Sequence, residues 1–194
     1  MNKAGIITLI VILALGKVSA QQTRKADAAA TKIEWNGKKV LGEHTGTISL
    51  KEGWLTTDKN AITGGEFVVD MTTIADTDIK DEQTRGKLEG HLKSDDFFGV
   101  QKYPLSSLII TSGGKFDKGS ATIKGNLTIK EKTNPVEFTV TETLSGEAAT
   151  YSAVIKIDRT LYDIKYGSGK FFSDLGDKAI YDEFTLNVTL VVKK

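Results

Sequence analysis

The chain has 194 residues and contains no cysteine, only two prolines and almost no excess charge of either sign. The missing thiols exclude disulfide bonds, thiolate metal sites and a lipid-modified N-terminal cysteine, so packing alone must stabilise the fold. The 26 basic and 25 acidic side chains leave a net charge of +1. This balance supplies no large field that would attract nucleic acid, and no nucleic-acid partner is expected.

The N-terminal apolar run is too short to cross a bilayer. It covers residues 4–15 and ends before Lys17, whereas a transmembrane helix needs about 20 apolar residues. Two polar residues precede the run, and the small residues Ser19 and Ala20 follow it. We therefore predict a secretory signal peptide over residues 1–20, cleaved near Ala20, no stable membrane span, and a periplasmic or secreted location.

The rest of the chain contains many short segments in which apolar and polar residues alternate. Successive side chains of a strand point to opposite faces, so this pattern is typical of half-buried strands. The clearest segments lie at 184–192, 121–129 and 136–140, with a turn predicted at 133–135, and others lie at 33–35, 48–50, 67–71 and 151–157.

These strands predict one all-β domain over 31–194, preceded by a polar, flexible lead-in over 21–30. Alternation alone is compatible with a closed barrel and with a two-sheet sandwich. Residues 74–104 are the exception, because alternation stops there and charges cluster. We predict a helix over 78–92 and a second helical turn that Ser94 caps, in a segment that either plugs a barrel end or lies outside it.

Part of this exceptional segment resembles a known sequence motif. The motif of the YceI-like family is similar to the strings GHLKSDDFF at 90–98 and KYP at 102–104. Weaker similarity covers the segments 35–46, 64–71, 125–130 and 158–184, and the resemblance as a whole extends over about 31–194. Two departures are the segment 131–135, where the family usually has Gly-Val-Thr-Lys-Pro, and Gly99, where it usually has Asp.

The resemblance implies an antiparallel lipocalin-like β-barrel of about eight strands, with the short helical insertion near residues 74–104. Family members bind isoprenoid quinones, polyprenyl phosphates or fatty amides, often as homodimers, and are not generally enzymes. The implied function is carriage or storage of a long-chain isoprenoid or similar lipid in the barrel interior. A bound lipid is the expected partner, a homodimer is an implied assembly, and no cofactor is expected. The alternatives are an enzyme that acts on an isoprenoid lipid and a structural or interaction module with a filled core.

A barrel of this size has room for interior side chains or for one small ligand. Small inward residues would leave a tunnel, and Gly64, Ala121, Gly125 and Ala153 occupy strand positions where large residues are otherwise common. Of the paired Phe97 and Phe98, one is expected to face the barrel and the other to anchor the helical segment. The hypothetical apolar lining comprises Trp54, Phe67, Val69, Phe97, Phe98, Ile123, Leu127, Phe138, Ile155 and Phe184.

Polar candidates are few. His91 is assigned a structural role or a contact with a lipid head group, and Arg159 could present its guanidinium to a phosphate or carbonyl, although an ion pair with Asp163 is preferred. No catalytic residue and no metal site is assigned. The segment 167–170 fits neither a serine-hydrolase elbow nor a phosphate loop, and the acids between 76 and 82 fit a solvated helix start better than a calcium loop.

Overall fold

The computed structural model describes residues 21–145 and 148–193. The predicted signal peptide over 1–20 lies outside the described residues. Within the described part, no helix is long and apolar enough to cross a membrane. The elements are β1 (Gln22–Lys25), β2 (Lys32–Lys39), β3 (Gly42–Asp58), β4 (Ala61–Asp76), α1 (Glu82–Lys93), β5 (Leu105–Ser112), β6 (Ser120–Ile129), β7 (Lys132–Ser145), β8 (Ala148–Asp158), the 3₁₀ turns η1 (Arg159–Tyr162) and η2 (Gly176–Lys178), and β9 (Ile180–Lys193).

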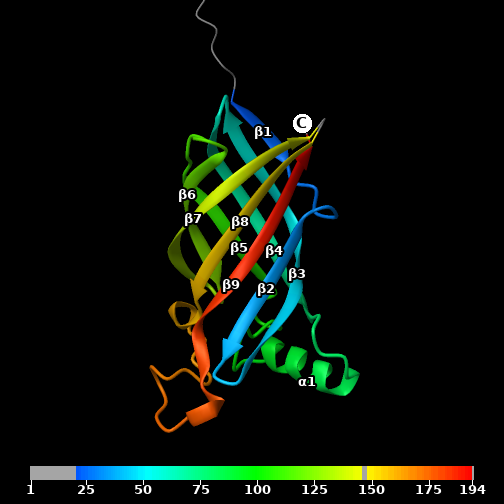
Figure 1. The fold of residues 1–194 in the computed structure, drawn as a ribbon, viewed down its shortest axis with the longest axis vertical. Coiled ribbons are helices and arrows are strands. Elements are labelled where there is room, and N and C mark those ends of the chain that lie inside the picture. The colour runs from blue at the N-terminus through cyan, green and yellow to red at the C-terminus, as the bar shows by residue number, and fades with distance from the viewer. Residues whose placement is uncertain (1–20, 146–147, 194) are drawn as a thin grey trace, which may run out of the picture.

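The strands form one antiparallel sheet that closes on itself (Figure 1). The order β1-β3-β2-β9-β8-β7-β6-β5-β4 is completed by direct pairing of β3 with β4. Strands β2 to β9 therefore form a closed eight-stranded barrel to which β1 is added. Closure removes the free strand edges that would otherwise be open to pairing with other chains. The predicted lipocalin-like barrel with a short helical insertion is confirmed.

The polar segment before Thr31 is part of the barrel wall, contrary to the flexible lead-in expected over 21–30. Gln22 to Lys25 pair with β3 at Thr57 to Trp54, beyond the point at which β2 stops pairing with that strand. Ala26, 5% exposed, bridges to Val192 of β9. The prediction was wrong because β1 has only four residues, which is too short for an apolar alternation to be visible in the sequence.

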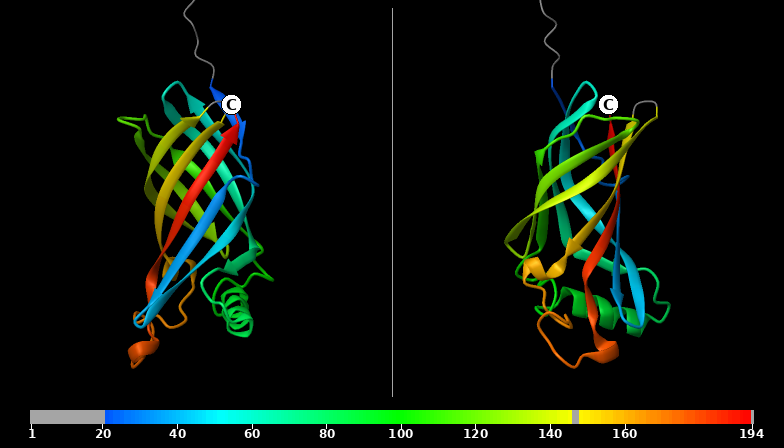
Figure 2. Two further views of the ribbon diagram at one scale, coloured as in Figure 1. Left: turned by 45° about the vertical axis from the view of Figure 1, so that its right-hand side comes forward. Right: turned by 60° about the vertical axis from the view of Figure 1, so that its left-hand side comes forward.

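The helical insertion follows β4 at the lower end of the barrel (Figures 1 and 2). Helix α1 begins later than predicted, because Asp81 is its N-cap and accepts a hydrogen bond from the Thr84 backbone N–H at 2.8 Å. No residue of α1 is fully buried, and the helix lies across the lower rim of the barrel with Leu92 packed against the lower core clusters. Asp76 is not part of a solvated helix start, since it ends β4 and is 5% exposed.

The turn that follows α1 inserts into the barrel end. Ser94 ends the helix, and its backbone oxygen accepts hydrogen bonds from the N–H groups of Phe97 and Gly99 at 3.1 and 2.8 Å. Phe97 and Val100 are buried. The insertion thus combines the two arrangements that the sequence left open, since its helix lies outside the strand wall and the turn after it covers part of the barrel end.

The hairpin between β6 and β7 turns at Lys130 and Glu131, not at the predicted 133–135, which lies within β7. Both turn residues have positive φ, 48° and 60°, as in a type I′ turn, whose twist matches that of the two strands. Pro135 is tolerated in β7 because pairing with β8 begins only at Val140, so its missing N–H leaves no gap in that ladder.

The buried side chains form one large cluster in the upper half of the barrel and two smaller ones below. Phe116, from the β5–β6 connection, contacts Tyr151 with ring centroids 6.2 Å apart. The Phe116 N–H donates a hydrogen bond to the Asn60 carbonyl, and the Asn60 side-chain amide donates one to the Phe116 carbonyl, each at 2.9 Å. The lower clusters centre on Phe97 with Ile155, and on Met71 with Val100. Between these clusters the interior is not filled.

Replacing Glu131 by glycine should stabilise the protein. The left-handed conformation costs a non-glycine residue about 1–2 kcal/mol, partly offset by the greater chain entropy of glycine. We expect Glu131→Gly to raise the free energy of unfolding by about 0.5–1 kcal/mol in urea titrations. The matched control Glu137→Gly, within strand β7, should lower it. A decrease for Glu131→Gly would contradict the assigned turn.

Candidate ligand-binding site

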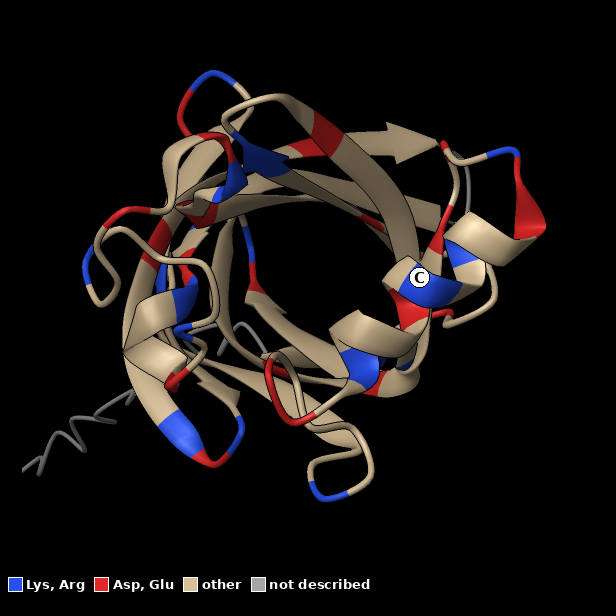
Figure 3. Cartoon of the chain, turned by 90° about the horizontal axis from the view of Figure 1, so that it is seen from below, with Lys and Arg blue, Asp and Glu red and all other residues tan. Residues whose placement is uncertain are grey.

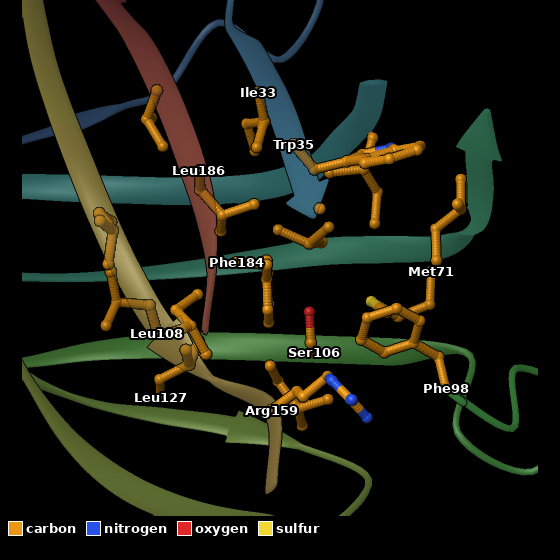
Figure 4. Close-up of a pocket in the computed structure, with 18 of the residues that line it drawn as sticks. Ile33, Trp35, Met71, Phe98, Ser106, Leu108, Leu127, Arg159, Phe184 and Leu186 are labelled. Carbon is orange, nitrogen blue, oxygen red and sulfur yellow. The ribbon is translucent and has the colours of Figure 1, made fainter. Parts of the chain in front are cut away.

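The inward faces of the strands enclose an apolar cavity of about 580 Å³. In Figure 4, Trp35 of β2, Phe184 of β9 and Leu108 of β5 converge on a common space with side chains of other strands. A volume of this size is typical of sites for one small ligand, which range over roughly 300–1,000 Å³. The interior is therefore an open cavity and not a filled core.

Nine of the ten apolar candidates from the sequence line this cavity. Contact with a ligand stays a prediction for each of them. Those nine are Phe67, Val69, Phe97, Phe98, Ile123, Leu127, Phe138, Ile155 and Phe184.

Trp54 is the exception, because its side chain points away from the cavity and is 41% exposed. Its neighbour Leu55 is 2% exposed and lines the cavity instead. The cause is a bulge, since the pairing of β3 with β4 shifts between Leu50 and Glu52. One extra residue reverses the inward and outward faces of everything after it, so even-numbered positions face inward before the bulge and odd-numbered positions after it.

Phe97 and Phe98 both line the cavity, although only one was expected to face it. Phe97 lies beside Tyr166 with ring centroids 5.6 Å apart, and Phe98 meets Phe184 edge-on at 6.3 Å. His91 joins this aromatic group through edge-on contacts with Phe97 at 4.9 Å and Tyr166 at 4.6 Å. Its Nε2 lies 3.6 Å from Oδ2 of Asp96. The last turn of α1 and the segment that follows it thus form one side of the cavity wall at the lower end of the barrel.

Among the four small residues that were expected to leave space, Ala153 lines the cavity. Gly125 is small for a different reason, which is a steric one. A Cβ at this position would lie 2.8 Å from the Ile109 carbonyl oxygen and 2.9 Å from Cδ1 of Leu108. That glycine lets β5 approach β6 closely. Ala121 belongs to the upper core cluster, and neither it nor Gly64 contributes to the lining.

Arg159 is a buried cation in the lower wall of the cavity, only 4% exposed. Its guanidinium donates hydrogen bonds to three backbone carbonyls, those of Tyr181 at 3.1 Å, Ile164 at 2.9 Å and Ile180 at 3.0 Å. Its charge lies over the ring of Phe97 at 5.8 Å. Burial lowers the pKa of this guanidinium, against the opposing effect of Asp182. Arg159 thus joins η1 to the start of β9.

The preferred ion pair of Arg159 with Asp163 was wrong. Asp163 lies in the left-handed conformation at φ 61° just after η1, and its carboxylate pairs with Lys165 at 2.6 Å. The acidic partner of Arg159 is Asp182 of β9, with Nη2 and Oδ1 3.7 Å apart. Sequence proximity failed here because β9 returns antiparallel beside β8 and brings a distant carboxylate closer.

The charged groups of the lining gather at the lower end of the barrel. Figure 3 shows this end from below, with the connections between the strands around its rim. Lys38 and Lys39 end β2, His44 lies near the start of β3, and Asp177 and Lys178 belong to η2. Polar groups at one end of an otherwise apolar space identify that end as the mouth.

Several lining residues were missed from the sequence. They include Trp35, Leu50, Met71, Leu108 and Tyr151, each in a strand with alternating residues. That alternation could have identified them once the inward face of each strand was known. Burial, followed by the nearby Glu142, raises the pKa of Tyr151, so its hydroxyl stays protonated at neutral pH.

A closed antiparallel barrel around an apolar cavity with a polar mouth defines the lipocalin-like class of β-barrel. Within that class, the model of the YceI-like domain matches residues 25–192. The chain belongs to the YceI-like family.

Solved structures agree on the fold. The chain is similar to BcnA of Burkholderia cenocepacia, with TM-score 0.69 and 20% identity over 86% of this chain and 98% of that one. It also resembles a polyisoprenoid-binding domain from Saccharophagus degradans, with TM-score 0.61 and 14% identity over 87% of this chain and 97% of that domain. A YceI protein of Campylobacter jejuni aligns with TM-score 0.53 and 16% identity over 69% and 73%. Comparison with curated protein sequences gives no significant match.

Replacing Arg159 by methionine should destabilise the barrel strongly. The change leaves three backbone carbonyls without their charged donor, and we expect the free energy of unfolding to fall by about 3–5 kcal/mol. Urea denaturation of the purified variant measures it. As a control, Arg85→Met removes a single long hydrogen bond of 3.5 Å and should change stability by less than about 0.5 kcal/mol. Equal stability of the two variants would contradict a supporting role for Arg159.

Proposed function

We propose that this protein binds a long-chain isoprenoid or similar lipid inside its barrel, for carriage or storage in the periplasm. The observation that carries the proposal is the 580 Å³ cavity, with apolar walls and charged groups at one end. An apolar cavity is filled most favourably by hydrocarbon. A lipid with an apolar tail and a polar head matches both parts, the tail along the walls and the head at the mouth.

The cavity limits the length of the buried tail. A water-sized group occupies about 30 Å³, and a methylene is of similar size, so 580 Å³ accommodates roughly 20 non-hydrogen atoms. Burying 20 methylenes would contribute roughly 16 kcal/mol gross, from which association and ordering costs of about 4–15 kcal/mol are subtracted. The tail therefore dominates affinity, and isoprenoid units beyond this length would extend out of the mouth.

The comparisons support the ligand class. The similar domain from Saccharophagus degradans is described as polyisoprenoid-binding, and this chain shares its fold with a TM-score of 0.61. We extend that ligand class, and the periplasmic location predicted from the N-terminal sequence, to this protein. A homodimer stays a prediction, which light scattering of the purified protein would check.

The enzyme alternative needs paired titratable groups inside the cavity. Of the described lining residues, Tyr151 and Arg159 have pKa values displaced by burial. The tyrosine stays neutral, and the guanidinium is engaged by three backbone carbonyls. These properties suit ligand binding and structural support of the barrel better than proton transfer. Chemical conversion of a recovered lipid by the protein would favour the enzyme.

Extraction of the purified protein with organic solvent, followed by mass spectrometry, tests the proposal directly. We expect close to one lipid per barrel, or uptake of added geranylgeraniol to that stoichiometry. Affinity should rise along a series of isoprenoid alcohols and level off at about 20 carbons. Protein that yields no lipid and takes up none of the series would overturn the proposal.

Filling the cavity should block binding. Ala153 faces the cavity and Val154, the next residue of β8, faces solvent at 58% exposure. We expect Ala153→Phe to weaken geranylgeraniol binding about tenfold or more by occupying part of the tail site, while Val154→Phe binds like the unmodified protein. Calorimetric titration measures both. Equal affinities for the two variants would place the lipid elsewhere.

A further inference from the structure

A cluster of one imidazole and two carboxylates lies at the rim of the barrel, near the mouth of the cavity. It comprises His44 near the start of β3, Asp76 at the end of β4 and Asp78 in the connection to α1, with one donor atom from each residue within 4.8 Å of the others. His44 also lines the cavity.

The pairing of β3 with β4 holds this cluster together. Gly46 pairs with Asp76 across the two strands, and the Thr77 N–H donates to the Thr45 carbonyl at 2.9 Å. One oxygen of Asp76, Oδ1, accepts a hydrogen bond from the Ile79 N–H at 2.8 Å. These contacts fix the backbone of the two strand ends and the side chain of Asp76.

The other oxygen of Asp76 has no hydrogen-bond donor. Its side chain is fully buried, and Oδ2 accepts no hydrogen bond although it lies only 4.0 Å from Nδ1 of His44. A buried carboxylate oxygen without a donor is costly, and its presence calls for an explanation such as a cation.

The distances fit a small divalent ion. Two donors of a tetrahedral zinc site lie about 3.4 Å apart, given bond lengths of about 2.0–2.2 Å. Nδ1 of His44 lies 3.3 Å from Oδ2 of Asp78 and 4.0 Å from Oδ2 of Asp76, so small side-chain movements suffice. The set of one nitrogen and two oxygens suits zinc, whereas calcium prefers six to eight oxygens.

We propose that His44, Asp76 and Asp78 bind a divalent transition-metal ion of the zinc class. Three protein ligands leave at least one coordination position for water or another oxygen donor. The ion would neutralise the two carboxylates and fasten the segment that leads into α1 to strand β3. The site differs from the absence of metal expected from the sequence, because its ligands Asp76 and Asp78 lie 32 and 34 positions after His44 and show no motif.

Calorimetric titration of the untagged mature protein with zinc chloride tests the site. We expect one ion per chain, and a rise in melting temperature on the order of 5 °C when free zinc exceeds the Kd about a hundredfold. His44→Gln, Asp76→Asn and Asp78→Asn should each weaken zinc binding about tenfold or more. The control Glu43→Gln removes an adjacent exposed carboxylate and should bind zinc like the unmodified protein.

Side-chain ¹⁵N NMR adds a readout that needs no substitution, since zinc should shift Nδ1 of His44 and leave His91 unchanged. Asp78 is partly exposed, so Asp78→Asn should fold even if Asp76→Asn does not. Absence of binding at millimolar zinc, which would mean that the two carboxyl groups share a proton, would overturn the proposal. So would equal zinc affinity in the unmodified protein and the ligand variants.

Discussion

Pairing of β3 with β4 closes the sheet, and the rest of the structure depends on this closure. Once the sheet is closed, each strand has one face toward a shared interior, and that interior must be filled by side chains or by a ligand. The two strands are the longest in the barrel, with 17 and 16 residues. Their shared ladder also includes the bulge after Leu50 and holds the carboxylate of Asp76 against His44. The pairing of β3 with β4 thus determines both which residues of β3 face the interior and how the side chains at the rim are arranged.

Much of the barrel and most of its lining follow from residue alternation, and the failures occur where alternation changes phase or is too short to detect. Phe67, Ile123 and Phe138 line the cavity as alternation predicts, because each lies within an uninterrupted alternating segment. Trp54 does not, because a one-residue bulge precedes it and leaves little trace in composition. The turn at Lys130 and Glu131 was also missed, since neither residue is a usual choice for positive φ.

The polar part of the site was harder to predict, because backbone groups and distant residues define it. The partners of Arg159 are three carbonyls and one carboxylate, contributed by the segment after η1 and by β9. Every residue has a backbone carbonyl, so no sequence pattern marks those three partners. What the sequence did provide was the motif at 90–98, and the structure explains its composition. His91 of α1, Phe97 and Phe98 form an aromatic wall at the lower end of the cavity.

The two ends of the barrel differ in what the chain places there. Strand β1 begins, and β9 ends, at the end opposite α1 (Figure 1), while the mouth and its loops contain neither end of the described chain. A linker joined beyond Lys193 would therefore leave the protein with its mouth directed away from the point of attachment. On a sensor surface or at the end of a fusion partner, such an orientation keeps the cavity accessible without any redesign of the barrel.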